Sequence, residues 1–370
     1  MIPVPPDAPR VCDLILLTWN RVDLTRPCVE RILKSTQLPV RLIIVDNGST
    51  DQASQAFLHE VTGTSWVQVE VIRRPRNDGY AVGMNTGLAN ATAPWVCLLN
   101  NDILVTDGWL EEMIRVGESD RSLGLINPMS NEFGVSPQPE QSIDSVAEQC
   151  RHQPHAWIEH WGGVGFCLLI PQPVLKAVGG LDEEFQFMYF EDADYSLRVR
   201  QAGFHCAVAE RAYVWHHGSA TMKQDPSRDQ RFADNANRFY HKWPQAKPQR
   251  IAWILGRKQA RLPDPLPEQI RELANRGHKV WVVGIDPTTD RLPRHLHIVP
   301  KMISSLGRAV KILAWVLTKK KRFHRIVTGT PSWERIFAGF ASVHRAQVES
   351  PTHLSMTGVA NPAGGEIVHG

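Results

Sequence analysis

Three carboxylates stand close together in the segment LDEEFQFMYFEDADYSLRVRQAGF. Glu191, Asp192 and Asp194 lie in or just before the first turn of a predicted helix, because apolar residues at helical spacing follow them. The helix dipole favours an acid near its N-terminus by about 0.3 to 1 kcal/mol, which accounts for one or two of the three. The apolar residues of that face are Tyr195, Val199 and Ala202.

Aromatic residues flank these acids on their N-terminal side. Rings packed around a carboxylate remove water from it and raise its basicity, which prepares the carboxylate to accept a proton. This segment is therefore the densest chemistry in the sequence. The rings belong to Phe185, Phe187, Tyr189 and Phe190.

A second chemical feature is the stretch WVCLLNND, Trp95 to Asp102. An apolar run that ends in two amides and a carboxylate is typical of a buried strand that carries Asn100, Asn101 and Asp102 to the edge of a sheet. For Asp102 alone, a helix cap is an equal alternative. Asp107, ahead of the helical pattern Trp109 to Val116, is predicted to be such a cap.

The elements that position these residues alternate between strand and helix over the first hundred residues, which predicts a doubly wound α/β sheet. Each strand ends in polar residues, and strand ends that meet at one edge indicate a nucleotide site. The alternative for any single loop is that loops are polar anyway. The predicted strands are Val11 to Leu17, Val40 to Val45, Val67 to Ile72 and Trp95 to Leu99, and their polar ends are Thr18 with Asn20, Asp46, Arg74 with Asn77, and Asp102.

Glycines recur every four residues in NDGYAVGMNTGLANA, at Gly79, Gly83 and Gly87. Small residues at that spacing let a backbone or a ligand approach closely. The pattern is not the dinucleotide-binding GxGxxG, because neither the spacing nor the acidic residue after the second strand matches.

The segment from Met129 to His155 is polar and weakly periodic, so we expect a long surface excursion. Val164 to Ile170 is predicted to be a buried strand, and Pro171 to Val178 a helix that ends at the following glycines. The strand Ala207 to Trp215 ends in His216 and His217. A histidine at a strand end is more often a satisfied polar side chain than a metal ligand, and two in a row near an acidic rim strengthen the alternative of a ligand.

The totals limit the classes of function. A length of 370 residues favours two domains. The 41 basic and 38 acidic residues give a net charge of +3, which is too small to indicate a nucleic-acid-binding protein. The N-terminus resembles no signal peptide, and no apolar run reaches the length of a membrane span, so we expect a cytoplasmic protein. The six cysteines form no CxxC pair and are expected to be buried, reduced thiols. They are Cys12, Cys28, Cys97, Cys150, Cys167 and Cys206.

Residues 11 to about 243 resemble a family 2 glycosyltransferase of the GT-A fold, close to the rhamnosyltransferase-like branch. Six blocks in order carry the resemblance, and each block alone is a weak signal. They are TWNR (18–21), VDNGSTD (45–51), NDGYAVGMNTGL (77–88), LLNND (98–102), GGLDEEFQFMYFEDADYSLR (179–198) and VWHHGSAT (214–221).

The resemblance implies roles for individual residues. Asp192 is the expected general base with Glu191 beside it, and Asp102 and His216 are the expected ligands of a Mn2+ or Mg2+ ion. It leaves open which of His216 and His217 points inward. The remaining assignments are nucleotide binding by Thr18, Asn20, Asp46, Asn77, Gly79, Asn85 and Asn101, and the acceptor side for Trp161, Gly162 and Gly163.

The sequence departs from the family pattern at Asn100, where many relatives have the first acid of a DXD-type motif. A site with one carboxylate has less negative charge, so we expect weaker metal binding that depends more on the diphosphate of the donor. Inverting transfer by direct displacement needs a metal to neutralise the leaving diphosphate and one base for the acceptor hydroxyl.

We expect a GT-A domain over residues 1–248, with a Rossmann-like mixed sheet, and a smaller α/β domain over 249–370. The second contains ELANRGHKVWVVG, similar to the opening half of a GT-B glycosyltransferase, although the motif is common to many Rossmann-like domains. Its predicted elements are strands at Arg250 to Gly256, Lys279 to Ile285 and Arg325 to Gly329, and a helix at Glu268 to Arg276. The stretch Ala309 to Phe323 is either a peripheral membrane contact, because a basic run ends it, or a core helix with a solvated basic end.

The sequence thus predicts an inverting glycosyltransferase that uses a nucleotide-sugar donor and a glycan or lipid-linked acceptor in bacterial surface polysaccharide synthesis. We expect every donor, metal and base residue to lie before Thr221, so that the C-terminal region serves placement or acceptor access. The alternative from another class is a catalytically silent nucleotide- or carbohydrate-binding module on the same fold. The loss of the first acid at Asn100 favours that alternative, and the presence of Asp102, Asp192 and His216 together opposes it.

Overall fold

The computed structural model describes residues 9–218, 227–259, 264–285, 292–303 and 308–351. Within these ranges the chain forms two compact units. The first contains the residues up to Ile158 and from Gly162 to Lys242, and the second contains Glu159–Trp161 and the residues from Trp243 onward. The short segment Glu159–Trp161 therefore belongs with the C-terminal unit, although its neighbours in sequence do not.

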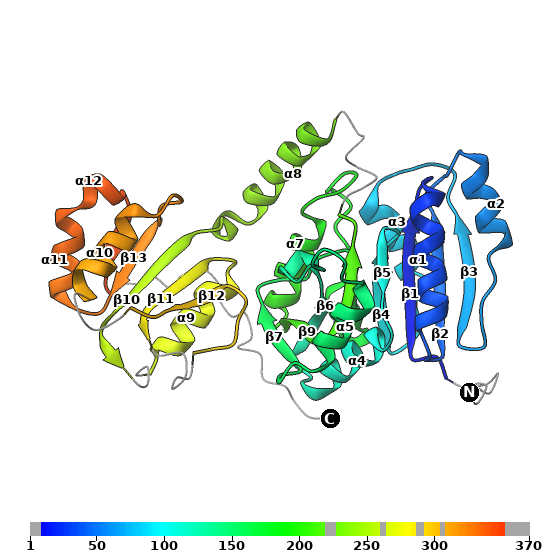
Figure 1. The fold of residues 1–370 in the computed structure, drawn as a ribbon. Helices are drawn as coiled ribbons and strands as arrows, with labels where there is room; N and C mark the ends of the chain where they lie inside the picture. Colours follow the sequence, from blue (N-terminus) through cyan, green and yellow to red (C-terminus); the bar gives the residue numbers. More distant parts are fainter. Residues whose placement is uncertain (1–8, 219–226, 260–263, 286–291, 304–307, 352–370) are drawn as a thin grey trace, which may run out of the picture. The chain divides into compact units, whose positions relative to one another are not determined.

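The first unit is built on a mixed sheet, which has nine strands among the described residues (Figure 1). The strand order is β3-β2-β1-β4-β8-β6-β9-β5, and β7 pairs with β9. The first four strands of this order are parallel, whereas β8 runs antiparallel to both β4 and β6. The strands are β1 (Cys12–Thr18), β2 (Val40–Asp46), β3 (Val67–Arg73), β4 (Trp95–Asn100), β5 (Ile103–Val105), β6 (Leu123–Met129), β7 (Trp157–His160), β8 (Cys167–Pro171) and β9 (His205–His216).

Helices cover both faces of this sheet, so its central strands read as continuous apolar runs. Along β1, Leu14 and Leu16 pack into one core cluster and Ile15 into the other. The first cluster includes side chains of α1 (Val22–Ser35), α2 (Gln52–Glu60) and α4 (Trp109–Ser119), and the second includes side chains of α3 (Tyr80–Leu88), α6 (Gln172–Val178) and α7 (Glu191–Gln201). The unit ends in α8 (Arg228–Lys242). This arrangement confirms the predicted α/β fold class with a mixed sheet.

The parallel register brings the polar strand ends to one level. Thr18 of β1 lies opposite Asp46 of β2, and Leu17 of β1 lies opposite Asn100 of β4. In a sheet ordered 3-2-1-4 the crevice beyond these carboxyl ends is where ligands bind.

Two local expectations were wrong. Asp107 does not cap α4, because the N-cap residue is Gly108 with φ of 76° and no side-chain cap bond. The segment from Met129 to His155 is not a plain excursion, since it contains α5 (Ile143–Arg151), which begins at the cap Ser142. This helix buries Val146, Ala147 and Cys150. Its apolar face is so short that the polar residues around it in the sequence conceal the helical pattern. The six cysteines are buried as predicted.

The second unit contains a parallel sheet that has five strands in the described residues, in the order β12-β11-β10-β13-β14. It confirms the expected smaller C-terminal α/β region, while its likeness to half of a GT-B enzyme stays a prediction. The strands are β10 (Arg250–Gln259), β11 (Lys279–Ile285), β12 (Ile298–Lys301), β13 (Arg325–Thr328) and β14 (Gln347–Glu349), and the helices are α9 (Leu266–Asn275), α10 (Arg308–Thr318), α11 (Pro331–Gly339) and α12 (Ala341–His344).

The helix α10 falls in the stretch for which membrane contact and core packing were alternatives. Its Ile312 and Val316 are buried in the core cluster of the second unit, and Leu313 and Trp315 pack against that cluster. This burial favours the core helix. Among the helices that the structure describes, none is long and apolar enough to span a bilayer.

A buried charge fixes the start of β4 against β1. The carboxylate of Asp13, which is 0% exposed, accepts hydrogen bonds from Arg41 Nε at 2.9 Å and from the N–H groups of Thr92 and Ala93 at 2.6 and 2.9 Å. Burial alone would raise the pKa of Asp13, but these bonds outweigh it and lower the pKa. Asp13 therefore holds the turn that leads into β4.

We predict that Asp13→Ala lowers the free energy of unfolding by roughly 3 to 5 kcal/mol, because it leaves Arg41 and two backbone N–H groups without their acceptor. The matched control is Glu70→Ala, which removes the exposed partner of the same Arg41 and should cost no more than about 1 kcal/mol. Because its folded pKa is lowered, the stabilisation by Asp13 is present at neutral pH and is lost as the pH falls through that pKa. Urea denaturation of both variants measures the difference, and equal costs would contradict the assignment.

Candidate functional site

The turn after β2 is fixed by side chains from two strand ends. Asp46 Oδ1 accepts from the Ser49 N–H at 2.8 Å, and the Asn20 N–H donates to Ser49 Oγ at 2.8 Å. Asn20 Oδ1 in turn accepts from the Asp51 N–H at 3.2 Å. Asp46 is 1% exposed, and its Oδ2 lies 3.8 Å from Arg73 Nε. The predicted base-reading residue is therefore held in a preorganised turn.

The turn before α3 is joined to β2 by a residue that the sequence analysis did not single out. Asn47 Nδ2 donates to Asn77 Oδ1 at 2.8 Å and to the Gly79 carbonyl at 3.1 Å, and Asn77 Oδ1 also accepts from the Gly79 N–H. Gly79 has φ of 95°, and a Cβ there would lie 2.7 Å from the Phe187 backbone. Asn77 and Gly79 thus lie together, and the available signal for Asn47 was its place in VDNGSTD.

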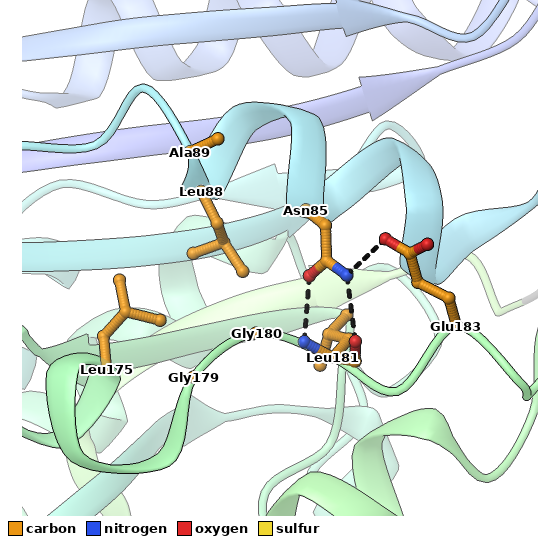
Figure 2. A pocket seen from close by; sticks show the side chains of 8 residues that line it. All are labelled: Asn85, Leu88, Ala89, Leu175, Gly179, Gly180, Leu181 and Glu183. Atoms are coloured by element: carbon orange, nitrogen blue, oxygen red, sulfur yellow. Dashed lines mark hydrogen bonds between the residues drawn. The ribbon is translucent and has the colours of Figure 1, made fainter.

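Asn85 contacts neither Asn47 nor Asn77 through its side chain, but a different segment. Figure 2 shows its amide pointing at the segment before α7, where Nδ2 donates to the Leu181 carbonyl and to Glu183 while Oδ1 accepts from the Leu181 N–H. The same residues border an open hollow of about 430 Å³ that Leu88 and Leu175 also line. Asn85 ties α3 to that segment, and its assignment to the nucleotide stays a prediction.

Asp102 and His216 lie side by side at the ends of β4 and β9. Asp102 Oδ1 is 3.2 Å from His216 Nε2, and Glu132 Oε1 is 2.9 Å from His216 Nδ1. Burial lowers the pKa of His216, but its bonds to the two carboxylates raise it to about 9. The neighbouring His217 is exposed, so His216 is the histidine that faces the carboxylates.

Other side chains around Asp102 fix this pair. The His216 ring stacks on Phe166 with centroids 5.1 Å apart, and Asn100 Nδ2 is 3.5 Å from His216 Nε2. Asn101 points toward β1 and α1 instead. Its Nδ2 donates to Thr25 Oγ1 of α1 at 2.9 Å and lies 3.4 Å from Thr18 Oγ1 of β1. Sequence reasoning missed Glu132 and Phe166, because neither stands in a strand-end motif.

The site offers a divalent ion one oxygen and one nitrogen donor. Asp102 and His216 offer one carboxylate oxygen and one imidazole nitrogen at adjacent positions, and a carboxylate on the far ring nitrogen is the usual support of a metal-binding histidine. Over the described ranges, however, no group of three or more His, Cys, Asp or Glu side chains is arranged to hold a metal. The remaining ligands would have to come from the donor diphosphate or from water.

Glu191 and Asp192 open α7 as predicted. Glu191 is 6% exposed and its Oε2 has no hydrogen-bond partner among the described residues, whereas Asp192 is partly exposed and its Oδ2 accepts from the Gly165 N–H at 3.1 Å. Burial raises the pKa of both groups, and the charge of Asp192 raises that of Glu191 further. Asp192 is therefore the more accessible of two unusually basic carboxylates.

Asp194, the third acid of the segment, has a different environment. It is 0% exposed and pairs with Arg198 Nε at 2.8 Å and with Lys242 Nζ at 2.7 Å. Two cations thus pair with this carboxylate inside the first unit.

The residues assigned to the acceptor side divide between the units. Trp161 belongs to the second unit, where its ring lies 3.7 Å from the position that a Cβ would take at Gly277. Gly162 and Gly163 belong to the first, and the Gly163 N–H donates to Ser196 Oγ of α7 at 2.8 Å. Their role toward an acceptor stays a prediction, and the end of the VWHHGSAT motif, 219–221, lies outside the described residues.

The sequence profile described as Glycosyl transferase family 2 matches residues 13–155, the range that contains the ends of β1, β2 and β4 and Asp102. Residues 13–155 belong to glycosyl transferase family 2. The chain thus carries a glycosyltransferase domain, and its mixed α/β sheet is of the GT-A type that the resemblance implied.

Relatives of the family 2 domain extend over more of the chain. The uncharacterized protein y4gI of Sinorhizobium fredii is 25% identical over 65% of this chain, which covers 28% of that protein. The N-acetylglucosaminyl-diphospho-decaprenol L-rhamnosyltransferase of Mycobacterium tuberculosis is 25% identical over 54% of this chain and 75% of its own length. Among solved structures, the mannosyltransferase PcManGT of Pyrobaculum calidifontis superposes with a TM-score of 0.48 and 17% identity over 64% of this chain and 65% of that one.

We predict that the free energy of unfolding falls as the pH rises from about 5 to about 8, because Glu191 has a folded pKa of about 8 against an ordinary value of 4.5. In this window the unfolded chain has released the proton that the folded chain still holds. Glu191→Gln should remove most of this slope, on the order of a few kcal/mol across the window.

The control for this prediction is Glu184→Gln, which changes an exposed acid of the same segment and should leave the slope as it is. Urea denaturation at pH 5, 6.5 and 8 measures all three proteins. A Glu191→Gln protein with the same slope as the parent would show that Glu191 ionises at its ordinary pKa.

Proposed function

We propose that the first unit is an inverting glycosyltransferase that moves a sugar from a nucleoside diphosphate to a hydroxyl of a glycan or lipid-linked acceptor. The observation that carries the proposal is the pair Glu191 and Asp192, two basic carboxylates with no cation partner among the described residues. They lie in the unit that contains the family 2 match and Asp102 beside His216. A relative named as an L-rhamnosyltransferase supports a lipid-linked acceptor in surface polysaccharide assembly.

The strand ends supply the donor site in this proposal. Asp46 reads the base, with Thr18 and Asn20 lining its pocket, because the turn after β2 holds the carboxylate in place before any ligand arrives. Asn77 and Gly79 lie along the ribose and diphosphate, where the lack of a side chain at Gly79 permits close approach.

A divalent ion would be held by Asp102 and His216, with the diphosphate completing its coordination. When bound it would neutralise the charge that develops on the leaving diphosphate. Glu132 orients the imidazole by accepting a bond from Nδ1, and Asn100 supplies an amide where an acid would add a second negative charge. Mn2+ and Mg2+ are the two candidates, because both accept oxygen ligands.

The chemical step needs one base. The acceptor oxygen attacks the anomeric carbon from the face opposite the diphosphate, its proton passes to Asp192 Oδ1 or Oδ2, and the bond from the anomeric carbon to the diphosphate breaks. Burial raises the proton affinity of Asp192, and the Gly165 N–H orients one of its oxygens. No protein nucleophile takes part, so the configuration inverts.

The competing hypothesis is a catalytically silent binding module, which Asn100 in place of an acid favours. Incubation with a panel of nucleotide sugars and Mn2+, with release of nucleoside diphosphate as the readout, decides between them. An acceptor probe is N-acetylglucosaminyl diphosphate on a short polyprenyl chain, chosen from the name of the relative. Binding of a nucleotide sugar without turnover, with or without this probe, would favour the silent module.

We predict that Asp192→Asn lowers the transfer rate by about 10²- to 10⁴-fold and leaves donor affinity nearly unchanged, because the base acts on the acceptor hydroxyl. The control is Asp107→Asn, which neutralises an exposed acid outside the site. Transfer kinetics and calorimetry with the nucleoside diphosphate test both halves of the statement. Turnover at the parental rate would exclude Asp192 as the base and leave Glu191 as the next candidate.

We predict that Asp102→Ala and His216→Ala each weaken Mn2+-dependent binding of nucleoside diphosphate, and that EDTA acts in the same direction. Asn100→Asp should strengthen it, because a second carboxylate adds negative charge to the site. His217→Ala is the matched control, since His217 is the exposed neighbour of His216. Calorimetry with and without Mn2+ gives the answer, and equal affinities in the two conditions would remove the metal from the proposal.

A further inference from the structure

The segment that leads into α7 has a strained backbone. Phe187, Tyr189 and Phe190 have φ of 63°, 79° and 73°, a left-handed region that large side chains rarely adopt. Phe190 is the N-cap residue of α7, and its carbonyl accepts from the Asp194 N–H at 2.8 Å. Because Glu191 and Asp192 follow directly, the conformation of this segment sets where the two carboxylates point.

On one side the strained segment is held by the turn before α3. The Tyr80 N–H donates to the Phe187 carbonyl at 2.6 Å, and the backbone of Phe187 lies where a Cβ of Gly79 would be. The Tyr80 hydroxyl donates to the Gly165 carbonyl at 2.7 Å, and the Gly165 N–H donates to Asp192. The donor-side turn and the proposed base are thus connected through this segment.

On the other side the segment is held by one residue of α8. Asn235 is 2% exposed, and its Nδ2 donates to the carbonyls of Gln186 and Met188 at 2.9 Å each and lies 3.3 Å from the Tyr189 carbonyl. Arg238 Nη1 donates to Asn235 Oδ1 at 3.0 Å, which fixes the orientation of the amide. The carbonyls of Gln186, Met188 and Tyr189 therefore share one buried side chain as their partner.

The same face of α8 makes two further contacts with this part of the chain. Phe239, four residues after Asn235, packs on the Phe190 ring at 5.2 Å between centroids, and Lys242 pairs with Asp182 and Asp194. Through these residues α8 contacts Asp182 and Phe190, which lie at the two ends of the segment before α7, and Asp194 in the first turn of α7. The position of α8 is therefore fixed by contacts other than those of Asn235.

We infer that Asn235 is the positioning residue of the general base: it holds the strained segment 186–190 and thereby sets the direction of Asp192. The inference rests on the proposed function and deepens it. Asn235 touches neither donor nor acceptor in this role, and it acts only through the backbone that carries the base.

The test compares Asn235→Ala with Asn237→Ala, an exposed asparagine two residues further along the same helix. We expect Asn235→Ala to lower kcat of transfer by up to about 100-fold, the cost of a displacement near 1 Å at the reacting groups, with no change in KM for the nucleotide sugar. Asn237→Ala should behave as the parent. Loss of donor affinity in parallel with kcat would instead indicate a general structural role and overturn the inference.

A double-mutant cycle with Asp192→Asn makes the test independent of stability. If Asn235 acts through Asp192, adding Asn235→Ala to Asp192→Asn should slow transfer little further. Fully multiplicative losses would overturn the inference. If Asn235→Ala unfolds at the assay temperature, Asn235→Ser, which keeps one hydroxyl donor, takes its place in the same cycle.

The cycle also separates the two failures. An Asp192→Asn enzyme with parental activity would refute the proposed base and the inference with it. An impaired Asp192→Asn enzyme beside a fully active Asn235→Ala enzyme would refute the inference alone.

Discussion

The site depends on one constraint, the parallel register of β1 with β2 and β4. Because Thr18 faces Asp46 and Leu17 faces Asn100, three chain segments that are far apart in sequence end at the same level of the sheet. Backbone bonds between buried strands cannot slip by one residue without turning every apolar side chain to the wrong core. The packing of Leu14, Ile15 and Leu16 in the two core clusters therefore determines the positions of the site residues.

Four carboxylates of the first unit have two kinds of environment. Asp13 and Asp194 are fully buried and each accepts from a cation, so their charges serve the fold. Glu191 has an oxygen without any described partner, and the pKa values of Glu191 and Asp192 are raised by burial. Within one helical turn the chain thus keeps an acid that pairs with Lys242 and Arg198 beside two acids whose pKa values are raised.

Much of this architecture was predictable because buried strands have a strong sequence signature. The first four strands, the acids at the start of α7 and the strand that ends in His216 were all found within a few residues of their observed bounds. The resemblance then named Asp102, Asp192 and His216, whose roles are still proposals.

What sequence reasoning missed depends on contacts between distant segments. Glu132 reaches His216 over 84 positions, and Asn235 reaches Gln186 over 49, so no local pattern marks either residue. The helix α5 was missed because only three of its residues are buried. Asp107 was predicted to cap α4, but the N-cap residue is Gly108, which has a left-handed backbone and makes no side-chain cap bond.

The membership of Glu159–Trp161 in the second unit has a consequence for synthesis on the ribosome. Glu159 Oε2 pairs with Arg271 Nε at 2.7 Å, and the Leu296 N–H donates to the Glu159 carbonyl, so the partners of this segment are made more than a hundred residues later. The growing chain makes these three residues before the C-terminal sheet to which they belong has emerged. The second unit is therefore completed by a segment that is synthesised well ahead of it, and a fragment that ends at Lys242 would contain this segment without the rest of its unit.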